Sequence, residues 1–257
     1  MADSTRSSVT ADAVVATRSA NTFEEAWRES APIGGWLSQP QARVLACYAE
    51  RVASGDWIVE VGSHHGKATV LMAKAKPAGT QVLAVDPFDD PRWGGGSVAF
   101  GVFESNLAAA GVAGQVSLFR GTSAEAASRW SGDRIGLLYV DGAHDRKSVL
   151  TDIRAWEPFI AQQGLVLFHD AFSSVGVTLA LLQRHLVSKQ FRYVGSVASL
   201  AIFQRQDQTA LATAANALRL TGRLGYFARN VAVKFALRQG RPGIAGLLGH
   251  HDAGCPF

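Results

Sequence analysis

The chain has 257 residues, of which 47% are hydrophobic and 18% charged, a composition typical of a folded globular protein and not of a disordered one. Its formal net charge is +4, and residues 207–257 account for all of it, with six basic side chains against two acidic ones. No apolar run approaches the roughly 18 residues that a membrane-spanning helix needs, so we expect a protein without a transmembrane segment.

The two ends of the chain and its cysteines indicate a cytoplasmic protein. Residues 1–20 are small and polar and lack the charged start and apolar core of a secretory signal, so we expect this segment to be disordered. Cys47 and Cys255 fit no metal-binding or redox spacing, which agrees with two free cysteines in a reducing compartment.

The basic C-terminal residues come without interleaved aromatic stacking platforms, which argues against a nucleic-acid partner.

Secondary structure is expected from residue 22 onward. Two helical patterns, "TFEEAWRES" and "SQPQARVLACYAERVA", come first, and Ser38 and Pro40 open the second of them. Strand and helix patterns then alternate strictly. The strands are expected at residues 57–62, 81–88, 115–121, 135–142, 164–170, 191–197 and 199–205, and the helices at residues 66–77, 97–112, 123–130, 146–160 and 175–187.

This alternation predicts an α/β fold. Strands that are continuous Val, Ile and Leu runs are typical of a parallel sheet covered by helices on both faces. The last two strands leave no room for a helix between them and should pair antiparallel. We therefore expect one domain over residues 21–206, followed by a basic helical extension over residues 207–257.

The carboxyl ends of the five parallel strands all carry polar or turn residues. Open α/β sheets bind their ligands at this edge, so these residues are the candidates for a site. They are Glu60, Asp86, the segment 121–123, Asp141, and the pair His169 and Asp170.

The turn after the first strand, "VEVGSHHGKAT", indicates a nucleoside ligand without phosphates. Only three residues separate Gly62 from Gly66, and Ala68 follows Lys67, so the phosphate-binding P-loop pattern fails, and the dinucleotide pattern lacks a glycine. Glu60 before the turn would repel a polyphosphate, and Asp86 is placed to accept hydrogen bonds from ribose hydroxyls. S-adenosylmethionine, a cationic sulfonium without phosphate, fits this pattern best.

The segments "VEVGSHHGKAT", "LAVDPF", "GTSAE", "YVDGAHDRKSVLTDIRAW" and "GLVLFHD" resemble the motifs of class I S-adenosylmethionine-dependent methyltransferases. More narrowly, they are similar to the small metal-dependent O-methyltransferases that act on sugars and catechols. The resemblance covers about residues 33–205. It implies a Rossmann-like fold with a seven-stranded mixed sheet in the order 3-2-1-4-5-7-6. One departure is Gln162-Gln163-Gly164, where many members have Pro-Gly-Gly before the fifth strand.

The resemblance also assigns the cofactor contacts. Glu60, Gly62 and Ser63 would face the methionine end of S-adenosylmethionine, and Gly66 and Asp141 would also bind the cofactor. Asp86 would hold the ribose, whereas Thr122 and Ser123 would flank the adenine.

A metal site is expected where the fourth and fifth strands end. Neighbouring strands lie about 4.8 Å apart, so side chains just beyond their ends can share one ion. Carboxylates at Asp141 and Asp170 suit Mg²⁺, Ca²⁺ or Mn²⁺, and His169 would shift the preference toward Mn²⁺, Fe²⁺ or Zn²⁺. The resemblance favours Mg²⁺. The alternative is that His169 and Asp170 only cap the following segment.

His144, three residues after Asp141, is the candidate general base. Imidazole has an ordinary pKa near 6.5 and can accept the proton of an attacking hydroxyl at neutral pH. A histidine here resembles the sugar-methylating branch, whereas the catechol-methylating relatives have a lysine. The branch makes a sugar or oligosaccharide the expected acceptor, for example at the 1-hydroxyl of a methylmannose oligosaccharide. A catechol- or polyketide-type methyltransferase and a non-catalytic S-adenosylmethionine-binding module are the alternatives.

The remaining polar features are expected to have ordinary roles. His64 and His65 belong to the cofactor loop by their backbone, and we expect His185, His250 and His251 to be solvated. Asp145 and Asp152 read as a first-turn and a surface helix residue.

Two longer segments allow several interpretations. Residues 86–100, with Trp93 and three consecutive glycines, read equally as a mobile lid or as an ordinary loop. The C-terminal extension could lie on a membrane surface, cover the acceptor site, or pack on the body or a second subunit. We favour packing and expect a homodimer.

Overall fold

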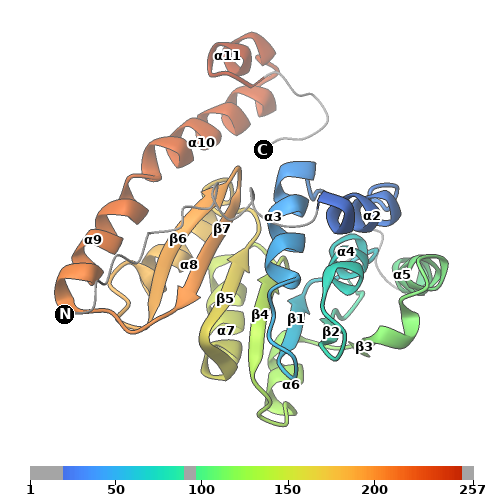
Figure 1. Ribbon diagram of the computed structural model, residues 1–257. Coiled ribbons are helices and arrows are strands. Elements are labelled where there is room, and N and C mark those ends of the chain that lie inside the picture. Colours follow the sequence, from blue (N-terminus) through green and yellow to red (C-terminus); the bar gives the residue numbers. More distant parts are fainter. Residues whose placement is uncertain (1–19, 90–96, 251–257) are drawn as a thin grey trace.

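Seven strands form one mixed sheet in the order β3-β2-β1-β4-β5-β7-β6 (Figure 1). The structure, a computed structural model, describes residues 20–89 and 97–250. Strands β1 to β5 pair parallel, and β7 is antiparallel to both of its neighbours, so the predicted topology and its terminal hairpin are confirmed. The strands are β1 (Trp57–Val61), β2 (Gln81–Val85), β3 (Val116–Phe119), β4 (Ile135–Val140), β5 (Ile160–Phe168), β6 (Phe191–Val197) and β7 (Leu200–Arg205).

Helices cover both faces of this sheet and create two cores (Figure 1). Alternate side chains of one strand enter different cores: Ile58 packs in the first, and Val59 and Val61 pack in the second. This two-sided burial explains why the strands are continuous apolar runs. The first core is covered by α2 (Ala20–Ser30), α3 (Gln39–Ala49), α4 (Lys67–Ala75) and α5 (Ser97–Ala109). The second is covered by α6 (Ser123–Ser128), α7 (Arg146–Trp156) and α8 (Val175–His185). Two 3₁₀ turns, η2 (Ala113–Gln115) and η3 (Glu157–Phe159), precede β3 and β5.

The carboxyl ends of the central strands lie level with one another. Val61 at the end of β1 pairs with both Val85 and Val140, and Val140 pairs with Phe168. The residues that follow these strand ends therefore leave the sheet at one edge, which is where the sequence predicts the site.

The C-terminal extension consists of α9 (Ala210–Thr221), α10 (Leu224–Arg238) and α11 (Pro242–Leu247). It packs on the body as favoured above, because the Asn216 Oδ1 atom accepts a hydrogen bond from the Tyr193 backbone N–H at 2.6 Å and Leu220 is fully buried in the second core. From there α10 runs diagonally past the end of the sheet toward α11 (Figure 1). Among the described residues, no helix combines the length and apolarity that crossing a membrane requires.

Candidate active site

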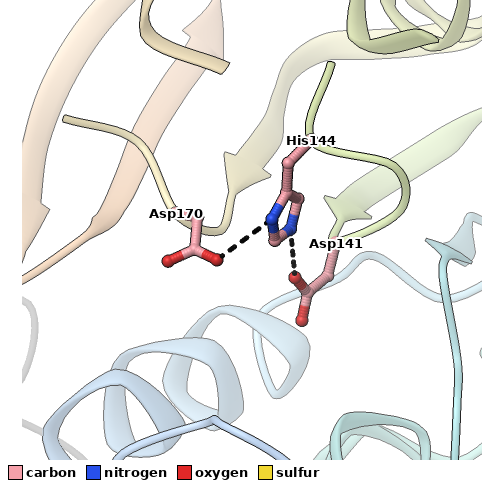
Figure 2. Close-up of side chains that lie close together, drawn as sticks. All are labelled: Asp141, His144 and Asp170. Atoms are coloured by element: carbon pink, nitrogen blue, oxygen red, sulfur yellow. Dashed lines mark ion pairs between the residues drawn. The ribbon is translucent and has the colours of Figure 1, made fainter. Parts of the chain in front are cut away.

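Three side chains from two adjacent strand ends meet at the carboxyl edge of the sheet (Figure 2). Asp141 directly follows β4, Asp170 follows β5 by two residues, and His144 lies in the loop between β4 and α7. The His144 Nε2 atom is 3.7 Å from Asp141 Oδ1, and His144 Nδ1 is 3.4 Å from Asp170 Oδ2. The imidazole thus lies between the two carboxylates, with 40% of its side-chain surface exposed.

The chemistry of these donors fits a divalent cation. One ligand atom from each of Asp141, His144 and Asp170 lies within 4.8 Å of the other two. Two carboxylate oxygens and an imidazole nitrogen form a donor set suited to Mg²⁺ or Mn²⁺. The structure therefore places the expected general base within the candidate ligand cluster itself.

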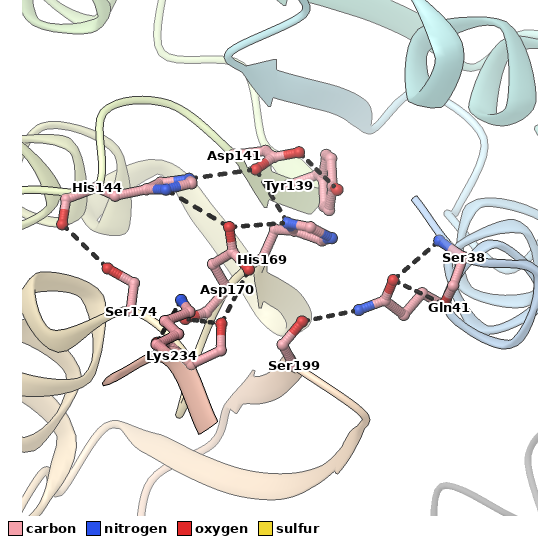
Figure 3. A network of polar contacts seen from close by, with 11 residues as sticks. Ser38, Gln41, Tyr139, Asp141, His144, His169, Asp170, Ser174, Ser199 and Lys234 are labelled. Carbon is pink, nitrogen blue, oxygen red and sulfur yellow. Dashed lines mark hydrogen bonds and ion pairs between the residues drawn. The ribbon is translucent and has the colours of Figure 1, made fainter. Parts of the chain in front are cut away.

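His169, the third predicted metal ligand, contacts this cluster from the protein interior. Its side chain is 4% exposed, and its Nδ1 atom is 3.2 Å from Asp141 Oδ1 and 3.7 Å from Asp170 Oδ2 (Figure 3). The Tyr139 hydroxyl donates to the second Asp141 oxygen, Oδ2, at 3.2 Å. Asp141 is consequently oriented from two sides by buried groups, and sequence reasoning did not identify Tyr139 because its position in β4 reads as core.

The cluster is strongly coupled electrostatically. Burial would raise the pKa of Asp170, but His169 and His144 hold that pKa well below its usual range. Burial likewise opposes ionisation of Asp141, yet His169 and His144 lower its pKa. Burial would lower the pKa of His169, but the two carboxylates raise it to about 10, and they also raise the pKa of His144 above its ordinary value. Both carboxylates are therefore ionised at neutral pH.

The glycine loop after β1 touches the same cluster through its backbone. Gly62 has a φ of 88°, and a Cβ added there would overlap the backbone carbonyl of Asp141. Backbone hydrogen bonds continue past the strand ends, from Gly62 N to Val85 O at 2.9 Å and from Asp141 N to Val61 O at 2.8 Å. Only glycine tolerates both this φ and this close approach. The loop that is expected to bind the cofactor is thus fixed directly against Asp141.

Asp86 holds the glycine loop in shape. Its Oδ2 atom accepts the backbone N–H groups of Ser63 and His64, each at 2.8 Å, and its Oδ1 atom accepts that of Phe88 at 2.7 Å. Asp86 therefore shapes the loop by its hydrogen bonds, and its contact with the ribose stays a prediction.

Glu60 lies beneath the same loop and is 1% exposed. Burial raises the pKa of Glu60 to about 8, although a hydrogen bond from the Thr69 hydroxyl opposes the shift. Its carboxyl group is therefore mostly protonated at neutral pH in the ligand-free protein.

The predicted adenine-side residues begin α6. Thr122 caps this helix, since its Oγ1 atom accepts from Glu125 N at 3.3 Å while the Glu125 carboxylate accepts from Thr122 N at 2.9 Å. The Ser123 hydroxyl accepts from Trp156 Nε1 at 2.9 Å. Both hydroxyls thus have structural partners at the expected end of the sheet. Gly66, the N-cap of α4 with a φ of 86°, packs against α5.

Two expectations for polar residues are wrong. His185 is not solvated: it is fully buried among aromatic rings, with Nε2 at 3.4 Å from Glu157 Oε1, and burial lowers its pKa to about 3. Asp152 is not a surface residue but is 6% exposed, and burial raises its pKa to about 6. Asp145 does serve in the first turn, because it caps α7 by accepting from Lys147 N and Ser148 N.

Some expectations fall outside the described residues. They concern the disorder expected for residues 1–19, the lid or loop expected around Trp93, and the expectations for His251 and Cys255. Within the described part, His64 and His65 lie in the glycine loop with their rings stacked at 3.7 Å between centroids, and Cys47 is buried.

Known proteins share part of the sequence pattern and the fold of this chain. Residues 59–171 match a family model described as a methyltransferase domain, and they include the glycine loop and all of the clustered side chains. The fold is similar to that of cofactor-bound Rv0187 from MTB, with a TM-score of 0.56 and 15% identity over 74% of this chain and 92% of that one.

Two further solved structures share the fold. An O-methyltransferase from Bacillus cereus in complex with SAH has a TM-score of 0.51 at 12% identity, over 76% of this chain and 94% of that one. CalS11, a TDP-rhamnose 3′-O-methyltransferase of calicheamicin biosynthesis, has a TM-score of 0.50 at 16% identity, over 74% and 97%. The chain therefore has the fold of these solved methyltransferases, and residues 59–171 match the methyltransferase domain model.

Proposed function

We propose that this protein is an S-adenosylmethionine-dependent O-methyltransferase that methylates a sugar hydroxyl. The observation that carries the proposal is the direct contact between the Gly62 loop and the backbone of Asp141, next to His144 and Asp170. A methyl donor bound on the loop would lie beside the groups that bind and deprotonate an acceptor. The cofactor-bound structures with the same fold support the choice of donor.

His144 is the residue we assign to proton transfer. As the acceptor oxygen forms its bond to the methyl carbon, the carbon–sulfur bond breaks and its electron pair stays on sulfur, giving S-adenosylhomocysteine. The hydroxyl proton moves to a nitrogen of the His144 imidazole, whose partial exposure leaves it open to an acceptor. The neighbouring carboxylates of Asp141 and Asp170 stabilise the imidazolium that results.

Asp141 and Asp170 are the residues we assign to a divalent cation, Mg²⁺ or Mn²⁺. Their ionised carboxylates and the nearby His169 imidazole would supply the donors, which leaves His144 as the base. A bound cation makes a coordinated hydroxyl more acidic. Its positive charge would also oppose the carboxylates that raise the pKa of His144.

A sugar or oligosaccharide is the acceptor we propose, with the 1-hydroxyl of a methylmannose oligosaccharide as the specific candidate. The support is the histidine at position 144, which resembles the sugar-methylating branch, and the likeness to a TDP-rhamnose methyltransferase. We place the reaction in the cytoplasm.

We also propose a homodimer formed through the C-terminal extension. Phe235 on α10 is 65% exposed and Leu247 on α11 is 90% exposed, and a second subunit would bury such side chains. Light scattering of the wild-type protein and of a Phe235→Ser/Leu247→Ser variant tests this assembly, with a monomeric variant as the expected result.

The acceptor class is tested by methyl transfer from isotopically labelled S-adenosylmethionine to methylmannose oligosaccharides, simple mannosides and glucosides, and catechols. We expect labelled sugars, loss of transfer with EDTA and recovery with Mg²⁺ or Mn²⁺. The same assay on His144→Ala tests the proposed base. His250→Ala, remote in sequence from the site, is the control for that variant. Transfer to catechols alone would assign the catechol class, and S-adenosylmethionine binding without any transfer would indicate a non-catalytic module.

A further inference from the structure

Helix α10 binds the turn that carries Asp170. The Asn230 Nδ2 atom donates to the Phe172 carbonyl at 2.9 Å, and the Lys234 Nζ atom donates to the Ser173 carbonyl at 2.7 Å. Figure 3 shows Lys234 close to Asp170. Asn230 and Lys234 are four residues apart and so lie on one face of the helix. Two consecutive carbonyls of the turn between β5 and α8 thus have their partners on an element about sixty residues later in the chain.

This turn needs external support because its backbone is strained. Asp170 has a φ of 54° and Phe172 a φ of 59°, a region that non-glycine residues rarely occupy. Such conformations persist when the surrounding structure over-determines them. Within the turn Ser174 N donates to Asp170 O at 2.9 Å, and the Thr178 hydroxyl of α8 accepts from Phe172 N at 3.0 Å. The carbonyls of Phe172 and Ser173 are held from outside, by α10.

The support reaches the Asp170 carboxylate through one residue. Ser173 is 1% exposed, its carbonyl accepts from Lys234, and its hydroxyl donates to Asp170 Oδ1 at 2.9 Å. The other carboxylate oxygen, Oδ2, faces His144. Lys234, Ser173 and Asp170 therefore form a chain of contacts from α10 to the candidate metal cluster.

We propose that Asn230 and Lys234 are positioning residues of the active site, which hold the 170–173 turn so that Asp170 points at His144 and Asp141. This inference rests on the proposed function, because it assumes that Asp170 binds a divalent cation. It gives helix α10 of the C-terminal extension a supporting role in the active site. The hydrogen bonds from the Asn230 and Lys234 side chains to the turn do not depend on that function.

The test uses the full-length protein and Mn²⁺ as the probe. Mn²⁺ binding is titrated by electron paramagnetic resonance in the wild type, Asn230→Ala and Lys234→Met. We expect the Kd for Mn²⁺ to rise about ten-fold in each variant, the size typical for losing a group that orients a metal ligand. Amide hydrogen exchange of Ser173 and Ser174, which donate to Asp170 O, should accelerate by a similar factor in both.

Two matched controls separate positioning from general loosening. Asn216→Ala removes an equally buried asparagine of the extension that bonds Tyr193 instead of the turn. Arg238→Met removes an exposed positive charge from the same helix. Both controls should retain the wild-type Kd and the wild-type exchange rates of the turn. The half-buried Lys234 keeps the test decisive if Asn230→Ala fails to fold.

Unchanged Mn²⁺ affinity and unchanged exchange in both variants would overturn the inference, as would equal effects in the controls. A wild-type protein that binds no Mn²⁺ contradicts the proposed metal instead. The exchange rates of Ser173 and Ser174 then decide on their own whether α10 positions the turn.

Discussion

The α-carbon of Gly176, in the first turn of α8, lies against the backbone carbonyl of His144. A Cβ placed on Gly176 would overlap this carbonyl and would come within 2.8 Å of Arg146 N. The Ser174 hydroxyl donates to the same His144 carbonyl at 3.3 Å. The loop that presents the proposed base is therefore packed by its backbone on the helix that follows the Asp170 turn.

Gly176→Ala should reduce methyl transfer at least ten-fold. The added methyl group would push on backbone atoms of His144 and Arg146, which cannot move aside as a flexible side chain can. Overpacking of this kind costs about 1–3 kcal/mol of stability. Urea unfolding and initial rates measure the two effects.

Gly101→Ala in α5 is the matched control, since nothing lies within 4 Å of a Cβ added there. Alanine should stabilise that helix by up to about 1 kcal/mol, as its intrinsic propensity predicts. Equal activity of both variants would mean that the His144 loop is not held by this contact.

Glu60→Gln should make stability less dependent on pH. The pKa of Glu60 in the folded protein is raised to about 8, above its ordinary value, so the folded state binds this proton more tightly than the unfolded state. The wild type therefore loses stability as pH rises through that pKa, by about 1.4 kcal/mol for each unit of pKa displacement.

Urea unfolding of the cofactor-free protein between about pH 5 and pH 9 measures this difference. The variant should gain on the wild type toward the alkaline end. Parallel stability curves for the two proteins would contradict the raised pKa of Glu60 that we expect from its burial. Glu125→Gln, at an exposed helix cap, controls for the loss of a carboxylate.

Asp141→Asn and Asp170→Asn should each weaken Mn²⁺ binding by ten-fold or more, because each removes one of the two ionised oxygen donors. Calorimetric titration provides the measurement. Asp133→Asn, an exposed change of the same kind, should leave the affinity as it is. Tight Mn²⁺ binding in the Asp141→Asn/Asp170→Asn double variant would place the metal elsewhere.

The strand order and the location of the site follow from the sequence because both depend on local patterns. Continuous apolar runs mark strands that are buried on both faces, and polar residues at their ends mark the edge where the site lies. Buried polar residues on helices were harder to predict. His185 follows Leu181 by four residues on a buried face of α8, a spacing that could have indicated its burial. Asp152 lies between Val149 and Trp156 in the same way on α7.

The contribution of α10 has no comparable signal in the sequence. Asn230 and Lys234 contact the turn across 58 and 61 positions, and polar residues on an amphipathic helix normally face water. The sequence also does not indicate the left-handed conformations of Asp170 and Phe172, because neither residue is glycine. Both features arise from tertiary packing.

In the proposed reaction, His144 removes the acceptor proton beside a methyl donor bound on the Gly62 loop. Single-turnover methyl transfer by His144→Ala, measured together with S-adenosylhomocysteine binding, tests it most directly. We predict unchanged S-adenosylhomocysteine affinity and a rate reduced by about 10²–10⁴, the usual contribution of a general base. A His144→Ala protein that transfers methyl groups at the wild-type rate would contradict the account.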